Sequence, residues 1–263
     1  MTVQIFPYDV YTILIYIFSV LFFITSSVTS YLILYKSTSS LKPYKYDFFM
    51  LNVWYQFAVF FAGIFGRLDV DFTVADTFCV TFGGLIQFLD LGFAYAELFI
   101  LVFTIGNVVN SVVFMFFFRY CHVCHPTTLY SRNLLWRNVI NGCISAVVTV
   151  SQALFFVMSV ITYKENPPES KNAEIEVCFT TSSLTYAYMV AAASHVVSAT
   201  LFALIFIKKV IFTFRRRMSK ASKKTKELHR MLTITLIVTG LIPSVLGGLP
   251  VVVGICAAAM RIF

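Results

Sequence analysis

The segment from Cys121 to His125 reads Cys-His-Val-Cys-His and is the densest group of metal-binding side chains in the sequence. Its spacing matches the C-x-x-C-H pattern of covalent haem attachment, and two Cys with two His would also suit zinc. However, the segment directly follows a long uncharged window. This position favours a short connecting loop beside a membrane, where a thiol stays reduced or is palmitoylated. We therefore expect no metal and no cofactor.

Other ionisable groups lie near or within apolar sequence. A membrane enzyme needs His and carboxylate side chains gathered at one depth, but only one His lies inside an uncharged window and no H-E-x-x-H motif occurs. We therefore expect no enzymatic activity. Ionisable groups at such places are candidates for ligand binding instead, namely Asp90, Glu97 and His195. The alternatives stay open: the two carboxylates would simply be hydrated, and His195 would be a packed polar group.

Long uncharged windows must position these residues. The 20 basic and 12 acidic residues all lie outside six windows, at 11–34, 48–66, 98–118, 138–161, 185–207 and 231–253. Each window is long enough to cross the hydrocarbon core of a bilayer as a helix, which takes about 20 residues. A helix also satisfies every backbone amide internally, as lipid requires.

The composition agrees with this interpretation. Only 12% of the residues are charged and 59% are hydrophobic, whereas soluble domains have about 25% charged residues. The aromatic content of 17% excludes a disordered chain. The sequence predicts an all-α membrane protein, with residues 1–263 forming a single bundle of six transmembrane helices.

The charges outside the windows set the orientation. Sixteen Lys and Arg residues fall in the loops on one side, ten of them between Lys208 and Arg230, and three fall in the loops on the other. Because basic loops stay in the cytoplasm, the amino terminus is predicted to lie outside. The net charge of +8 thus belongs mostly to a cytoplasmic face that attracts anionic lipid and acidic protein surfaces, not nucleic acid.

The outer loops hold two further features. Cys79 and Cys178 both lie on the oxidising side, so a disulfide between them is a prediction, with free thiols as the open alternative because sequence does not show the geometry. Between Arg67 and Glu97 we expect an exposed loop, followed by residues 80–97 that extend the next helix or lie at the interface. After 231, we expect one helix to about Val253 and then an emerging tail.

Three motifs now occur in order along the chain. The third window ends in Phe116-Phe117-Phe118-Arg119-Tyr120, the sixth is preceded by a basic stretch containing Met218, Ser219 and Leu228, and it contains Leu241-Ile242-Pro243. This pattern resembles the nematode serpentine chemoreceptors, which are seven-helix G-protein-coupled receptors of the group that contains the srh, str and sri families. The spacing of the basic stretch differs from the family pattern, and Thr239 and Gly240 stand where a Gln is usual.

The resemblance implies a function. Such a receptor binds a small, odorant-like external ligand, signals to a heterotrimeric G protein, and resides in the plasma membrane, in the sensory cilia of chemosensory neurons for this family. It would place the switch and the G-protein contact at Arg119, Tyr120, Arg215, Arg216, Arg217 and Pro243. An Arg that extends to lipid head groups is the alternative for Arg119, and a Pro merely tolerated in lipid is the alternative for Pro243.

Six windows are one fewer than the family's seven helices, which predicts a truncated or shortened form. Other classes remain as alternatives: a six-helix transporter or channel, or a truncated receptor that does not signal. A transporter would show repeated halves and a voltage-gated channel an Arg-rich helix, and neither pattern is evident.

Overall fold

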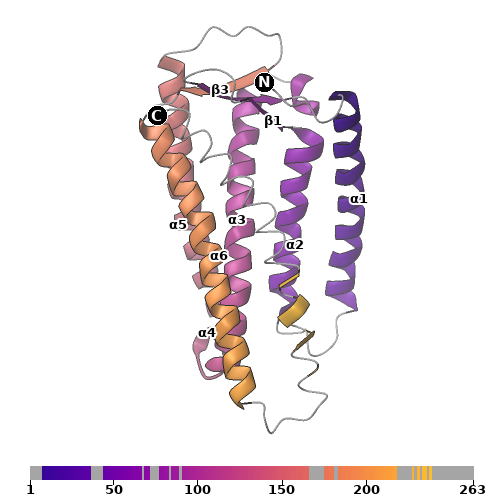
Figure 1. Ribbon diagram of the computed structural model, residues 1–263, viewed down its shortest axis with the longest axis vertical. Coiled ribbons are helices and arrows are strands. Elements are labelled where there is room, and N and C mark those ends of the chain that lie inside the picture. The colour runs from indigo at the N-terminus through magenta and orange to yellow at the C-terminus, as the bar shows by residue number, and fades with distance from the viewer. Residues whose placement is uncertain are drawn as a thin grey trace. The chain divides into compact units, whose positions relative to one another are not determined.

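The computed structural model describes residues 8–36, 44–66, 68–71, 77–82, 84–88, 91–165, 175–180, 183–217, 227, 230–231, 233–235 and 237–238. The longer helices are α1 (Tyr8–Tyr35), α2 (Lys45–Val59), α3 (Leu91–Cys124), α5 (Leu134–Glu165) and α6 (Ser183–Arg217). A π-helical turn, Phe60–Phe65, continues α2, and the short elements are α4 (Leu129–Arg132), a 3-10 turn at Leu85–Phe88, and strands β1 (Leu68–Asp71), β2 (Thr77–Phe82) and β3 (Ile175–Thr180) (Figure 1).

Five helices in the described part of the chain are long and apolar enough to cross a membrane. They run over Ile13–Tyr35, Lys45–Phe65, Gly92–Cys124, Leu134–Gln152 and Val190–Phe214. These spans overlap the first five uncharged windows, and the sixth window, 231–253, lies mostly outside the described residues. The all-α, multi-pass membrane fold is therefore confirmed, while the single bundle of six helices stays a prediction.

Large apolar side chains point away from the protein along α1. Phe18, Leu21 and Ile24 are each more than half exposed. In water this much apolar surface would be strongly unfavourable, but acyl chains solvate it without cost. The first helix therefore presents a lipid-facing surface.

The contacts group the chain into two compact units. The first is built mainly from Met1–Gly106 and Ser151–Tyr188, and the second mainly from Asn107–Val150 and Met189–Arg261. Because α3, α5 and α6 are each continuous helices, each contributes one part to the first unit and the other part to the second.

In the first unit, α1 and α2 lie side by side. Hydrogen bonds between polar side chains and a close backbone approach at a glycine hold them together. Asn52 Nδ2 donates to the Ser26 carbonyl and to Ser30 Oγ, both at 2.7 Å, and Asn52 Oδ1 accepts from Ser26 Oγ at 2.7 Å. Farther along, a Cβ on Gly63 would overlap the Ser19 hydroxyl. Small residues and interhelical hydrogen bonds are the usual means of helix association in lipid.

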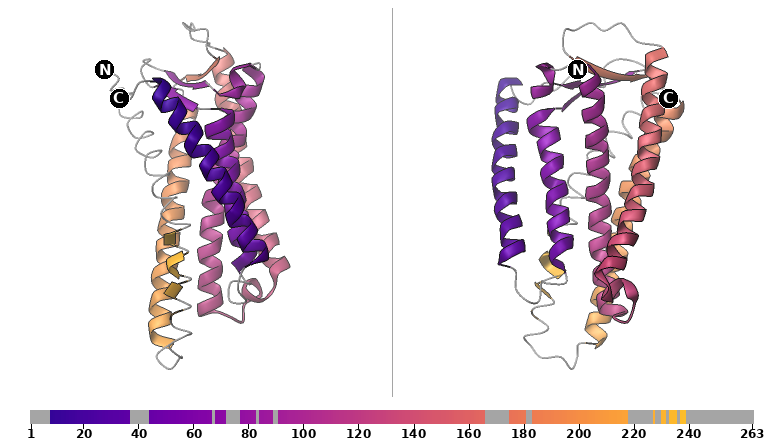
Figure 2. Two further views of the ribbon diagram at one scale, coloured as in Figure 1. Left: turned by 90° about the vertical axis from the view of Figure 1, so that its right-hand side faces the viewer. Right: turned by 180° about the vertical axis from the view of Figure 1, so that it is seen from behind.

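A three-stranded antiparallel sheet of order β1-β2-β3 also belongs to the first unit. Both views of Figure 2 place it at the level where α1 begins and α2 ends. The sequence-based expectation for 67–97 was incomplete, because it foresaw a loop and a helix extension but no strands. Residues 77–82 pair with 175–180, and only the part from Leu91 extends α3. This pairing supplies backbone partners to loop segments that are far apart in sequence.

In the second unit, α3 packs through aromatic rings against α6. The Phe117 and Phe206 rings have centroids 5.4 Å apart, and Tyr120 stacks on Phe206 at 5.5 Å. The helix α3 ends at Cys124, so the Cys-His-Val-Cys segment is helical rather than a loop as expected. The hydrogen bond from His125 N to the Cys121 carbonyl closes this last turn. It satisfies two backbone groups that would otherwise need other partners near the membrane.

Candidate functional site

Glu97, one of the expected ligand contacts, lies in the first turns of α3 and is buried, with 2% of its surface exposed. Neither carboxylate oxygen has a hydrogen-bond partner among the described residues. Gly66 packs directly against it: a Cβ on Gly66 would overlap Oε1 and lie 2.7 Å from Cδ. This burial disfavours the alternative that Glu97 is simply hydrated. Asp90 lies outside the described residues.

His195, the third expected ligand contact, is bonded across the second unit. Its Nε2 lies 3.2 Å from Asn110 Oδ1, so α6 is tied to α3 within their uncharged stretches. Asn110 is 6% exposed, and its Nδ2 is buried without a hydrogen-bond partner among the described residues. The sequence reasoning missed Asn110, although an Asn inside an uncharged window is itself a signal, because an amide in lipid needs partners.

Two arginines are buried at the inner end of the second unit. Arg119 is 2% exposed and Arg137 4%. The Arg137 guanidinium carbon lies 3.9 Å from the centroid of the Phe118 ring, a cation–π contact. An Arg that extends to lipid head groups would be exposed, so burial disfavours that alternative for Arg119. The sequence reasoning used Arg137 only as an orientation signal and missed its burial.

Tyr130, from the short helix α4, completes this packing. Its ring centroid lies 4.8 Å from that of Phe117, and its hydroxyl donates to Asn141 Oδ1 at 2.7 Å. The inner ends of α3 and α5 are thus held by one aromatic side chain. Nothing in the sequence pattern singled out Tyr130, since a Tyr near a membrane edge is ordinary.

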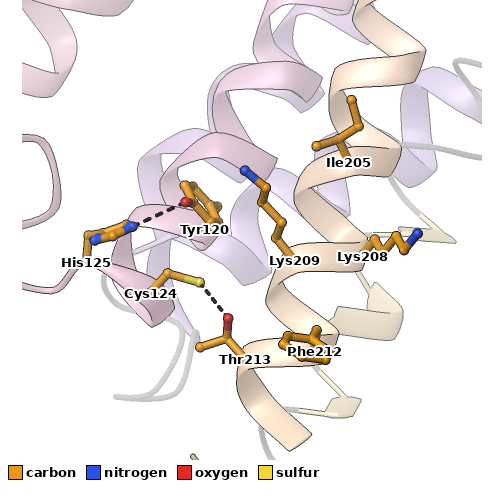
Figure 3. Close-up of a pocket in the computed structure, with 8 residues that line it drawn as sticks. All are labelled: Tyr120, Cys124, His125, Ile205, Lys208, Lys209, Phe212 and Thr213. Atoms are coloured by element: carbon orange, nitrogen blue, oxygen red, sulfur yellow. Dashed lines mark hydrogen bonds between the residues drawn. The ribbon is translucent and has the colours of Figure 1, made fainter. Parts of the chain in front are cut away.

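Tyr120 belongs to a second inner group, between α3 and α6. Its hydroxyl lies 3.2 Å from His125 Nε2, and Lys209 Nζ lies 5.5 Å from its ring centroid. One turn farther along α3, the Cys124 thiol donates to Thr213 Oγ1 at 3.3 Å. Figure 3 shows these side chains facing one another.

These contacts border a cavity of about 600 Å³. Its lining combines three basic side chains, two of them lysines on α6, with apolar and hydroxyl groups; the lining residues are Tyr120, Cys124, His125, Ile205, Lys208, Lys209, Phe212 and Thr213. All eight belong to the second unit. None of these eight described residues carries a carboxylate.

The remaining expected switch residues are described in part. Arg215, Arg216 and Arg217 form the last residues of α6, and Arg216 is exposed. The side chains of Arg215 and Arg217, and all of Pro243, lie outside the described residues.

The Cys-His-Val-Cys-His segment does not converge on one point. His122 Nδ1 lies 3.3 Å from Ser131 Oγ, His125 contacts Tyr120, and Cys124 contacts Thr213. Within the described part of the chain, no group of three or more His, Cys, Asp or Glu side chains could hold a metal ion. Neither the haem nor the zinc interpretation gains support from this arrangement.

The sheet places the two outer cysteines opposite each other. In the β2–β3 register, Cys79 pairs directly with Cys178. Opposed residues in antiparallel strands have Cα atoms about 4.5–5.5 Å apart, and disulfides need about 4.4–6.8 Å. The register is therefore compatible with a disulfide, which stays a prediction.

Long apolar helices, buried polar groups within them and a basic end on α6 define a multi-pass helical membrane protein. Over residues 8–263 the chain matches the model of the serpentine type seven-transmembrane GPCR chemoreceptor Srh family, and it belongs to that family. This match confirms the resemblance drawn from the three motifs, and it is to a family of receptors rather than enzymes. No curated protein and no solved structure matches the chain.

Proposed function

We propose that this chain is a chemosensory receptor that binds a small external ligand and transmits the binding to a heterotrimeric G protein. The observation that carries the proposal is the burial of Arg119 at the inner end of α3, with 2% exposure. A guanidinium is costly to remove from water and head groups unless it serves packing or function. Membership of a chemoreceptor family supports chemosensory signalling as that function.

The ligand contacts that we propose are polar groups within or beside the spans. Glu97 offers two carboxylate oxygens, and the Asn110–His195 pair offers the Asn110 Nδ2 donor, none of which has a partner among the described residues. Buried polar groups left this way favour a ligand or neighbour that satisfies them. Asp90 remains a proposed contact from sequence alone.

The switch works by population shift. A ligand that binds one packing of the helices more tightly than the other changes their ratio by its differential affinity. We propose that Arg119 and Tyr120 report that change to the G protein, together with the basic end of α6 (Arg215, Arg216, Arg217) and with Pro243. A family of this kind acts in the plasma membrane, and we extend the proposal to sensory cilia.

The test is ligand-evoked signalling in a heterologous cell. A panel of small volatile and water-soluble compounds is applied to cells that carry the chain and a G-protein activation reporter, and a response is expected to at least one compound. Arg119→Gln should abolish this response at equal surface expression, Arg119→Lys should weaken it, and the exposed control Arg132→Gln should keep it. If Arg119→Gln signals as well as the unaltered chain at equal expression, Arg119 is not part of the switch.

A further inference from the structure

The second unit carries an unusual excess of positive charge. Its segments 107–150 and 189–230 contain thirteen Lys and Arg residues and a single carboxylate, Glu227. Cations of this density repel one another unless anions come from outside the protein. The cavity between α3 and α6 lies within this field, and its lining contributes Lys208 and Lys209.

The depth of the cavity indicates where the anion comes from. Lys208 is the first charged residue after the uncharged window 185–207, so the two lysines lie where the hydrocarbon core meets the head groups. Their neighbours in the lining, Ile205 and Phe212, are exposed apolar residues, and Phe212 has 65% of its surface exposed. A cationic rim joined to an apolar wall at this depth fits an amphiphile rather than a free ion.

Contacts between side chains order part of the rim, whereas the exposed Lys208 side chain extends away from them. Lys209 Nζ lies near the face of the Tyr120 ring, and the Tyr120 hydroxyl contacts His125, so the three groups share one edge of the cavity. Thr213 offers a hydroxyl on the same lining. A phosphomonoester carries close to two negative charges at neutral pH and three acceptor oxygens. It therefore matches two ammonium groups and neighbouring donors better than a singly charged diester does.

We propose that this cavity binds the head group of an anionic inner-leaflet phospholipid bearing a phosphomonoester, a phosphoinositide, with Lys208 and Lys209 on the phosphate and Phe212 beside the acyl chain. The site lies between the inner ends of α3 and α6, next to Tyr120. This lipid site does not depend on the proposed external ligand. Lipid binding can be measured on the purified chain without that ligand or a G protein.

The experiment uses the full chain in phosphatidylcholine nanodiscs that contain 2 mol% phosphatidylinositol 4,5-bisphosphate, with binding read by lipid titration and native mass spectrometry. The Lys208→Gln/Lys209→Gln variant should weaken binding roughly 30-fold, since each lysine near a membrane surface contributes about fivefold. The matched control, Lys36→Gln/Arg132→Gln, removes two exposed cations elsewhere and should change affinity less than threefold. Phe212→Ser should also weaken binding of the lipid.

Three comparisons could overturn the proposal. Equal losses in the two double variants would mean that only the general field attracts lipid. Soluble inositol trisphosphate that binds as tightly as the lipid, with the same lysine dependence, would mean a free-phosphate site. A peptide from a G-protein α-subunit carboxyl terminus that displaces the lipid and binds through the same lysines would mean a protein contact. If the double variant aggregates, Lys208→Gln alone is compared, and a loss below twofold would overturn the lipid site.

Discussion

His195 Nε2 lies 3.2 Å from Asn110 Oδ1, and this contact ties α6 to α3 within their uncharged stretches. Both residues belong to the second unit. The two side chains satisfy part of each other's hydrogen-bonding capacity, and Asn110 Nδ2 remains buried without a partner among the described residues. The pair is therefore both a helix clamp and the polar part of the proposed ligand contact.

A double-mutant cycle on this pair should show coupling. Asn110→Ala and His195→Ala each remove the interhelical hydrogen bond, so the double variant should be more stable than the sum of the single losses predicts. Measured interhelical hydrogen bonds in membranes give about 0.6 kcal/mol, with an upper value near 1.7 kcal/mol. Thermal unfolding of the purified variants in detergent measures the coupling. Strict additivity would show that the contact contributes no net stability.

Asn52 should stabilise the pairing of α1 with α2 more than its neighbour Gln56 does. Asn52→Ala removes three hydrogen bonds of 2.7 Å to α1, and we expect a loss of about 1–2 kcal/mol from the membrane values for such bonds. Gln56→Ala, the control, removes one exposed contact of 3.3 Å to Ser27 and should cost far less. The measurement is the unfolding temperature in one detergent. Equal shifts in unfolding temperature for both variants would contradict a stabilising role for the Asn52 hydrogen bonds.

Gly66 should not tolerate a side chain. In Gly66→Ala, the new Cβ would overlap Glu97 Oε1 and lie 2.9 Å from the Phe61 carbonyl oxygen. The carboxylate can rotate but the carbonyl belongs to the backbone, so a loss of about 1–3 kcal/mol is expected for overpacking. The measurement is the yield of monodisperse protein and its unfolding temperature.

Gly142→Ala is the matched control for that substitution. Nothing lies within 4 Å of a Cβ at this position in α5, and alanine is favoured over glycine in a helix by about 0.5–1 kcal/mol. The control should therefore be neutral or stabilising. If Gly66→Ala behaves like Gly142→Ala, the tight contact with Glu97 does not exist in solution.

The spans could be predicted from sequence, because in lipid the absence of charge over about 20 residues is a nearly sufficient cause of a helix. The sheet could not. Strands of four to six residues have little pattern of their own, and β2 pairs with a strand almost one hundred residues away. The burial of Glu97 could not be predicted from sequence either, since it depends on packing against Gly66, which follows the π-helical turn after α2. Arg119 was found through its motif, whereas the burial of Arg137, whose guanidinium lies over the Phe118 ring, depends on packing that no motif marks.

The β2–β3 register predicts a disulfide between Cys79 and Cys178. The bond would close a loop of roughly one hundred residues, and bonds of this kind typically stabilise a protein by about 2–4 kcal/mol. Cys79→Ser and Cys178→Ser should therefore lower the unfolding temperature by the same amount, and the double variant should lower it no further, because each change breaks the same bond. Intact mass with and without reductant and a thiol-blocking reagent reads the bond directly, with the unaltered chain gaining two blocked thiols on reduction.

Cys143, an exposed free thiol on α5, provides the control. Cys143→Ser should leave both the unfolding temperature and the mass shift on reduction unchanged, since its thiol is blocked before reduction. Two outcomes would contradict the disulfide: a chain that gains no blocked thiols on reduction, or single variants whose effects add in the double variant. Either would leave the sheet held by its backbone hydrogen bonds alone, with Cys79 and Cys178 as opposed but separate thiols.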